Sequence, residues 1–292
     1  MRHDTIPQEG LSYAPCRYGS SRLLFRGPRR PLDGRYIAFV GGAETYGRFL
    51  ARPFPALVEE ALGEICVNFG QVNASVDAFL AEPAVTTACR EATLTVVEVM
   101  GAANLSNRFY TVHPRRNDRF LRASSIMRAV FPEVDLAEIC FTRHLLGHLH
   151  AMAPERFPIL REELQTAWSA RMRSFLERIG PRTLLLWFSP HLPSDLPWEE
   201  HPQPLLREPL FVTRRMLDSL RPLVRGVIMV QPSAGALQRR SEGLICRPQD
   251  RGAAAGLLGA AAHREAAAAL AASIRAFLAP EASGSPGIAQ PP

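Results

Sequence analysis

The sequence predicts a three-layer α/β/α protein with a mostly parallel five-stranded sheet and a helical insertion. Short apolar runs end in glycine, amphipathic segments follow them, and this alternation occurs three times in the first hundred residues. Near-continuous apolar runs are typical of strands that are buried on both faces of a parallel sheet. Repeated strand–helix units favour parallel pairing through right-handed crossovers.

Five segments have the composition of buried strands, at 36–41, 64–70, 94–100, 183–188 and 224–230. The first runs straight into Gly41 and Gly42, and open α/β sheets bind ligands at the carboxyl ends of such strands. We therefore expect the functional site at this turn. A weaker edge strand is expected at 243–246.

Helical spacing of apolar residues fills much of the remaining chain. Pro53 and Pro55 divide the first helical region into two short helices. The segment 102–133 is polar and predicts a loop that ends in a short helix, whereas 252–256 predicts a low-complexity linker. The expected helical segments are 46–62, 76–80, 85–92, 118–131, 135–152, 157–179, 210–220, 234–239 and 265–278.

The pattern indicates one α/β domain over residues 36–279. Residues 1–35 lack a clear period and predict an extended lead-in that covers a sheet edge. Helices within 116–179 are expected to form a cap over the sheet. Residues 280–292 are rich in Pro, Gly and Ser, which predicts a disordered tail.

Composition narrows the class of protein. The 292 residues are 47% hydrophobic and carry a net charge of +6, and all of the basic side chains are arginine. Anionic ligands suit this charge, but the arginines are dispersed and form no block of the kind that binds nucleic acid. No signal peptide and no apolar run of roughly 18 residues is present, so we expect a cytoplasmic protein without a membrane span.

Three motifs and one late histidine carry a family resemblance. The segment Gly41–Gly47 follows the first strand, Gly70 and Asn73 follow the second, and a Gly-x-x-Asn motif ending at Asn104 follows the third. His263 precedes the last helix. In this order the motifs resemble the blocks of the SGNH (GDSL-like) hydrolase superfamily.

The resemblance implies the roles of the residues concerned. It implies an oxyanion site made by the Gly70 amide with Asn73 and Asn104, beside a turn containing Gly42, and a base at His263. Ala43, however, stands where the superfamily has its nucleophilic serine, and Ala260 stands where it has the aspartate that orients the histidine. The resemblance is therefore to a bacterial branch in which the serine is replaced, and Ser-His-Asp hydrolysis is disfavoured.

Other groups near the turn leave alternatives open. Thr45 or Ser75 could substitute as a hydroxyl, although such hydroxyls more often belong to turns or cap helices. Glu44 could serve as a general acid or base, or it could cap the helix that follows.

A second cluster of donors follows the third strand. Forked guanidinium donors match phosphate or sulfate, so the cluster favours a phosphorylated, sulfated or acyl-CoA ligand, or a glycan. The alternative is a solvated surface loop. The ligand-binding candidates in this cluster are Asn104, Asn107, Arg108, His113, Arg115 and Arg116.

Neither a metal nor another cofactor is predicted. His144 and His148 share a helix face and His150 lies close by, but no carboxylate accompanies them at a zinc-protease position, and the five cysteines have no zinc-ligand spacing. The glycines at 252–256 do not follow a buried strand, unlike a dinucleotide-binding loop.

Two functions from different classes fit these observations. The first is a protein that binds an anionic or glycan-type ligand at the strand ends and possibly transfers an acyl or other group without a serine nucleophile. The second is a catalytically inactive SGNH-type binding or scaffold protein in bacterial polysaccharide metabolism. A third, a sulfotransferase-like or nucleotide-binding protein, requires a phosphate-cradling glycine loop that the sequence lacks.

Overall fold

A computed structural model describes residues 11–201 and 203–279. Its centre is a five-stranded parallel sheet with the strand order β2-β1-β3-β6-β7. All five predicted strands are confirmed, one with the predicted bounds, β6 (Thr183–Phe188), and four with slightly shorter ones, β1 (Ile37–Val40), β2 (Cys66–Asn68), β3 (Leu94–Glu98) and β7 (Gly226–Val230).

The strand order reverses direction between β1 and β3. The chain adds β2 on one side of β1 and then returns to place β3, β6 and β7 on the other side. In open α/β sheets, the loops that leave the two strands at such a switch point diverge to opposite faces and open a crevice at the carboxyl ends. The turn after β1 and the loop after β3 occupy this point.

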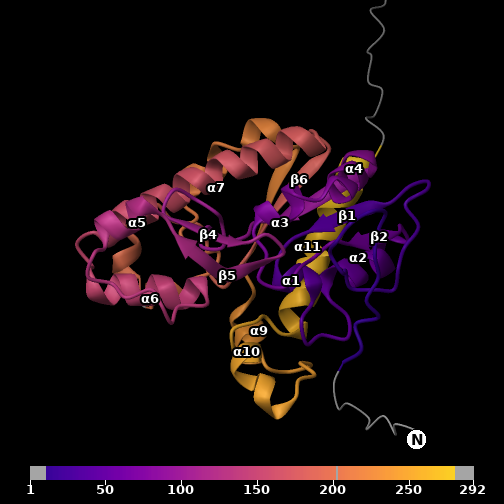
Figure 1. The fold of residues 1–292 in the computed structure, drawn as a ribbon. Helices are drawn as coiled ribbons and strands as arrows, with labels where there is room; N and C mark the ends of the chain where they lie inside the picture. Colours follow the sequence, from indigo (N-terminus) through magenta and orange to yellow (C-terminus); the bar gives the residue numbers. More distant parts are fainter. Residues whose placement is uncertain (1–10, 202, 280–292) are drawn as a thin grey trace, which may run out of the picture.

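Helices cover both faces of the sheet (Figure 1). Successive side chains along a strand point to opposite faces, so Phe39 packs with Phe54 of α2 (Phe54–Leu62), whereas Val40 belongs to the other core. Helix α11 (Ala260–Leu278) lies beside α2. The opposite face is covered by α3 (Val76–Leu80), α4 (Pro83–Glu91) and α7 (Phe157–Ile179).

The long helix α7 is anchored to the sheet by a wide apolar stripe. Leu160, Leu164, Trp168, Met172 and Phe175 recur at helical spacing and are at most 1% exposed. The indole Nε1 of Trp168 donates a hydrogen bond of 2.7 Å to the carbonyl of Met100. The predicted helix over 157–179 is confirmed with the same bounds.

The predicted cap is only partly helical. A β-hairpin of β4 (Tyr110–His113) and β5 (Arg116–Ala123) replaces the expected loop and the first part of the helix predicted over 118–131. Only α5 (Ser125–Val130) remains of that helix, because Ser124 caps it by accepting from the Met127 amide. Figure 1 shows the hairpin, α5 and α6 (Thr142–Met152) grouped near the start of α7.

Several other bounds differ from the predictions. The expected edge strand at 243–246 is wrong, since Leu244 makes only an isolated bridge to Leu50. The linker at 252–256 is mostly helical as α10 (Arg251–Ala255). The remaining short elements are α1 (Ala43–Tyr46), α8 (Arg214–Asp218), α9 (Ala234–Gln238) and 3-10 turns at Trp198–Glu200, Pro204–Leu206, Arg221–Leu223 and Pro248–Asp250.

The lead-in packs on the sheet through aromatic rings. Tyr18 and Phe25 lie edge-on to Phe69, directly after the edge strand β2, at 5.1 and 5.2 Å. The predicted disordered tail at 280–292 lies outside the described residues, as do residues 1–10. Over the ranges that the structure describes, no helix combines the length and the apolar character needed to cross a bilayer.

Candidate functional site

A buried carboxylate holds the turn after β1. Glu98 ends β3 and accepts hydrogen bonds from the amides of Gly42 (3.0 Å) and Thr45 (2.9 Å), and it also bonds the Thr45 hydroxyl. A side chain at Gly41 would place its Cβ 2.6 Å from Glu98 Cβ. The switch point between β1 and β3 is therefore filled by Glu98, and only glycine fits at position 41.

Burial governs the protonation of Glu98. The residue is 7% exposed, and removal from water raises its pKa to about 7, with the nearby Glu44 carboxylate adding to this effect. The Thr45 and Gly42 donors act in the opposite direction without cancelling it. Sequence reasoning missed this residue, although a single acidic residue inside the apolar run 94–100 was a visible signal.

Glu44 and His263 form a pair beside the same turn. The imidazole Nε2 lies 3.0 Å from Glu44 Oε2, and Nδ1 accepts a 3.1 Å hydrogen bond from the Phe54 amide. Because an accepting Nδ1 has no proton, the neutral ring carries its proton on Nε2 and donates it to Glu44. The other Glu44 oxygen accepts from the Leu258 amide at 2.9 Å.

The histidine of this pair is enclosed. His263 is 0% exposed, lies nearly parallel to the ring of Phe54 at 5.7 Å and meets Phe188 edge-on at 5.3 Å. Glu44 keeps 15% of its side chain exposed. Both ring nitrogens are therefore engaged, and the pair ties α11 to the turn after β1.

Neither position 43 nor position 45 offers an available hydroxyl nucleophile. Ala43 has no hydroxyl, and the hydroxyl of Thr45 is fully buried against Glu98. Ser75, the other hydroxyl considered, caps α3 and donates to Asn117 Oδ1 at 3.0 Å.

Two of the predicted oxyanion residues, Asn73 and Asn104, are in contact, and all three predicted donors already donate hydrogen bonds within the protein. The Gly70 amide donates to Asn68 Oδ1 at 2.8 Å, and Asn104 Nδ2 donates to the Asn73 carbonyl at 3.1 Å. Asn73 Nδ2 donates to Asp118 Oδ2 at 3.0 Å. In addition, Asn104 Oδ1 accepts from Thr142 at 2.6 Å. These groups join the loops after β2 and β3 to the hairpin and α6.

The other predicted ligand residues do not form one cluster. Arg108 Nε donates to Glu163 of α7 at 2.6 Å, and Asn107 Oδ1 accepts from the Phe109 amide at 2.8 Å. His113 Nδ1 accepts from the amides of Arg115 and Arg116, both at 3.2 Å.

The two arginines are exposed at the turn between β4 and β5. Asn117, which is 1% exposed, fastens this turn to the loop after β2 by accepting from the Ser75 amide at 2.9 Å.

The helix α6 carries the three histidines considered for a metal. His144 and His148 lie 6.3 Å apart, whereas His150 packs against Phe157 and Trp198. Within residues 11–201 and 203–279, no three His, Cys, Asp or Glu side chains are grouped to hold a metal ion.

Comparison with a family model decides the classification. A family described as a domain of unknown function, DUF6473, matches residues 1–278. The chain belongs to this family. A search of curated proteins found no match to this DUF6473 chain.

Solved structures with some similarity are esterases and lipases. A lipase from a goat rumen metagenome is 15% identical, with a TM-score of 0.43, and the match covers 82% of this chain and 97% of the lipase. A carbohydrate esterase family 2 enzyme with a carbohydrate-binding domain, from Corynascus (Myceliophthora fergusii), is 13% identical with a TM-score of 0.43, covering 87% and 69%. A lipase/acylhydrolase from Enterococcus faecalis is 13% identical with a TM-score of 0.42, covering 86% and 100%.

Proposed function

We propose that this protein binds an anionic or glycan-type ligand at the carboxyl ends of its strands and does not hydrolyse esters. The observation that carries the proposal is the bonding of His263, whose two nitrogens are both engaged inside the core. A general base for acyl transfer needs a free lone pair within reach of the proton that it removes. On this chain the lone pair at Nδ1 accepts from the backbone, and Nε2 is the donor to Glu44.

The environment of position 43 supports the same conclusion. Alanine there offers no nucleophile, and the Thr45 hydroxyl is withdrawn into the Glu98 bonds. The Gly70 amide and the two asparagines proposed for an oxyanion site each donate a hydrogen bond to a group of the protein. The loops at the strand ends are thus held together by polar contacts. Acyl transfer needs donors that are aimed at a developing oxyanion, so this arrangement favours binding over acyl transfer.

Esterase assays and ligand binding test the proposal together. With p-nitrophenyl acetate and with acyl-CoA donors, we expect no turnover by the wild-type protein above that of an Ala43→Val control, which keeps an apolar side chain at the turn. Thermal shift against sulfate, sugar phosphates and acyl-CoA is expected to show saturable stabilisation by at least one ligand. Turnover that is lost in His263→Asn, with folding retained, would refute the proposal.

Group transfer without a serine is a second candidate. Glu44 favours it, because this carboxylate is partly exposed at the turn and is backed by His263. In this reaction an acceptor hydroxyl would lose its proton to Glu44 and attack the acyl carbon of acyl-CoA. The carbon–sulfur bond of the thioester would break, and the departing CoA thiolate would take the proton from Glu44. Acyl transfer from acyl-CoA to a polyol that disappears in Glu44→Gln, but persists in Thr45→Ser, would favour this candidate over simple binding.

A further inference from the structure

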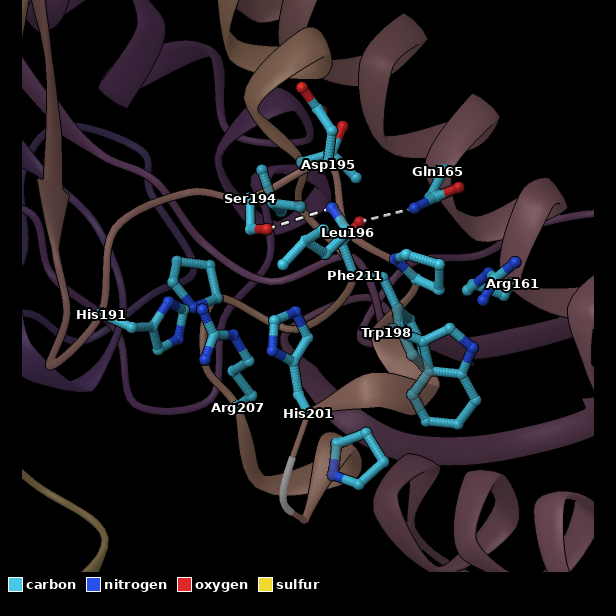
Figure 2. Close-up of a pocket in the computed structure, with 15 residues that line it drawn as sticks. Arg161, Gln165, His191, Ser194, Asp195, Leu196, Trp198, His201, Arg207 and Phe211 are labelled. Carbon is cyan, nitrogen blue, oxygen red and sulfur yellow. Dashed lines mark hydrogen bonds between the residues drawn. The ribbon is translucent and has the colours of Figure 1, made fainter.

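A pocket opens beside the carboxyl end of β6, in a part of the chain that the sequence motifs did not single out. It has a volume of about 330 Å³, which is within the range of small-ligand sites. Figure 2 shows its wall, built by the loop after β6, by a later segment and by the side chains of Arg161 and Gln165 on α7.

The loop that forms the pocket is anchored to the strand ends. The Ser189 hydroxyl donates to the Glu208 carbonyl at 2.8 Å, and the Ala102 amide donates to the Leu210 carbonyl at 2.9 Å. A side chain at Gly101 would place its Cβ 2.8 Å from the Leu210 amide. The pocket therefore belongs to the carboxyl-end edge of the sheet, next to the loop that follows β3.

Two polar atoms of the lining are buried without a partner. Trp198 Nε1 and His191 Nε2 form no hydrogen bond with the described residues. His191 Nδ1 lies 3.1 Å from the Leu192 carbonyl, so Nδ1 carries a proton and Nε2 presents a lone pair when the ring is neutral. Burial is the main cause that lowers the pKa of His191; the Leu192 carbonyl, and more weakly the Glu208 carbonyl, act in the opposite direction.

Arg207 brings a cation to the pocket. It is half-buried, and among the described residues its guanidinium makes one hydrogen bond, of 3.4 Å, to the Leu192 carbonyl. Among the residues that the structure describes, no Asp or Glu forms an ion pair with Arg207. The acid among the lining residues, Asp195, accepts instead from the Arg215 amide at 2.9 Å. Figure 2 shows Arg207 between His191 and His201.

Aromatic and proline side chains form part of the remaining wall, beside polar residues such as Ser194 and Thr213. Trp198 and Phe211 meet edge-on at 5.5 Å, and Phe211 has a φ of +65°, which is costly for a bulky residue. The Gln165 side chain holds that conformation by donating to the Phe211 carbonyl at 2.9 Å. Pro197, Pro204 and other apolar side chains complete the surface.

We propose that this pocket binds a phosphorylated monosaccharide. Arg207 would meet the phosphate, because a guanidinium without its own carboxylate is suited to a phosphate oxyanion. One sugar hydroxyl can donate to His191 Nε2, and a second hydroxyl, on another carbon, can accept from Trp198 Nε1. These two hydrogen bonds would satisfy two groups that are otherwise unpaired. The apolar walls match the carbon face of a sugar ring. This inference rests on the proposed binding function and gives it a place and a ligand class.

Isothermal titration with glucose 6-phosphate tests the assignment, with glucose and inorganic phosphate as probes for each half of the ligand. We expect saturable binding of glucose 6-phosphate and at least tenfold weaker binding of either control. Arg207→Gln should weaken binding at least tenfold, and Trp198→Phe, which keeps an aromatic ring but lacks the N–H, should weaken it severalfold. The matched control is Arg122→Gln, an exposed arginine of β5 outside the pocket.

The outcomes separate the pocket from the broader function. Equal affinity of the Arg207→Gln and Arg122→Gln variants for glucose 6-phosphate would refute this pocket as the binding site, while the proposed binding function would still stand. Binding of sulfate or acyl-CoA to the wild-type protein without any binding of glucose 6-phosphate would overturn the ligand class. If no ligand of either panel binds, the proposed function itself fails. Should Arg207→Gln unfold, Trp198→Phe decides the result, since it removes the Nε1–H donor and keeps a six-membered aromatic ring at the pocket wall.

Discussion

Substituting the buried carboxylate at the end of β3 gives a sharp test of the turn after β1. In Glu98→Gln, the amide oxygen can take the place of Oε2 and accept from the Gly42 and Thr45 amides. The side chain keeps its size and its hydrogen bonds but can no longer ionise. Any change in the pH dependence of stability then reports the charge alone.

The magnitude follows from the pKa. Below its ordinary value of 4.5, Glu98 is protonated in both folded and unfolded chains. Between 4.5 and about 7, the unfolded chain releases the proton while the folded chain retains it, so the free energy of unfolding falls as the pH rises. Each pKa unit corresponds to about 1.4 kcal/mol, so this carboxylate costs the folded state up to about 3 kcal/mol above pH 7.

Urea unfolding followed by tryptophan fluorescence between pH 4.5 and 8.5 measures this effect. The two proteins should have similar stability near pH 4.5, and Glu98→Gln should become more stable than the wild type by up to about 3 kcal/mol at pH 8. Glu91→Gln, a change of an exposed glutamate at the end of α4, is the control and should leave the wild-type slope unchanged. A constant difference between Glu98→Gln and the wild type across the range would refute the reasoning.

Three further substitutions probe the packing of the site, each measured by urea unfolding. Gly70→Ala should lower the free energy of unfolding by about 2–4 kcal/mol, because the new Cβ would lie 2.7 Å from Tyr46 Cα on the adjacent turn. Gly147→Ala on α6, where nothing lies within 4 Å of a new Cβ, should instead raise the free energy of unfolding by about 0.5–1 kcal/mol. A loss of stability would show that a methyl group at position 147 clashes with its surroundings. Asn117→Ala should cost about 2–3 kcal/mol by leaving the Ser75 amide unpaired, and an unchanged stability would mean that the hairpin is not held there.

Part of the candidate site followed from the order of the motifs. The turn at 41–47 and the loops after β2 and β3 meet at one edge, as the carboxyl ends of neighbouring parallel strands must. The hydrogen-bond partners of the side chains in these segments could not be predicted from the motifs. Glu44 and His263 are 219 positions apart, so their 3.0 Å contact depends on how α11 docks on the sheet.

The hairpin at 110–123 shows a limit of local patterns. Arg116, Arg119 and Arg122 make β5 polar, and polar segments without an apolar alternation predict loops. The segment nevertheless pairs with β4, because Phe120 packs on Tyr110 and the Phe120 amide donates to the carbonyl of Cys140. The contact with Cys140 joins positions 20 residues apart, so a short window of sequence does not contain both partners.

By itself, the sequence determined the five strands, their parallel arrangement and the edge at which loops gather, because burial on both faces of a sheet imposes long apolar runs that glycine ends. Only the tertiary structure decided the burial of Glu98, the engagement of both His263 nitrogens and the pocket beside β6. The reason is that protonation states and hydrogen-bond partners depend on groups brought together from distant positions. The pattern of apolar residues that marks a buried strand, in contrast, lies within a few consecutive residues.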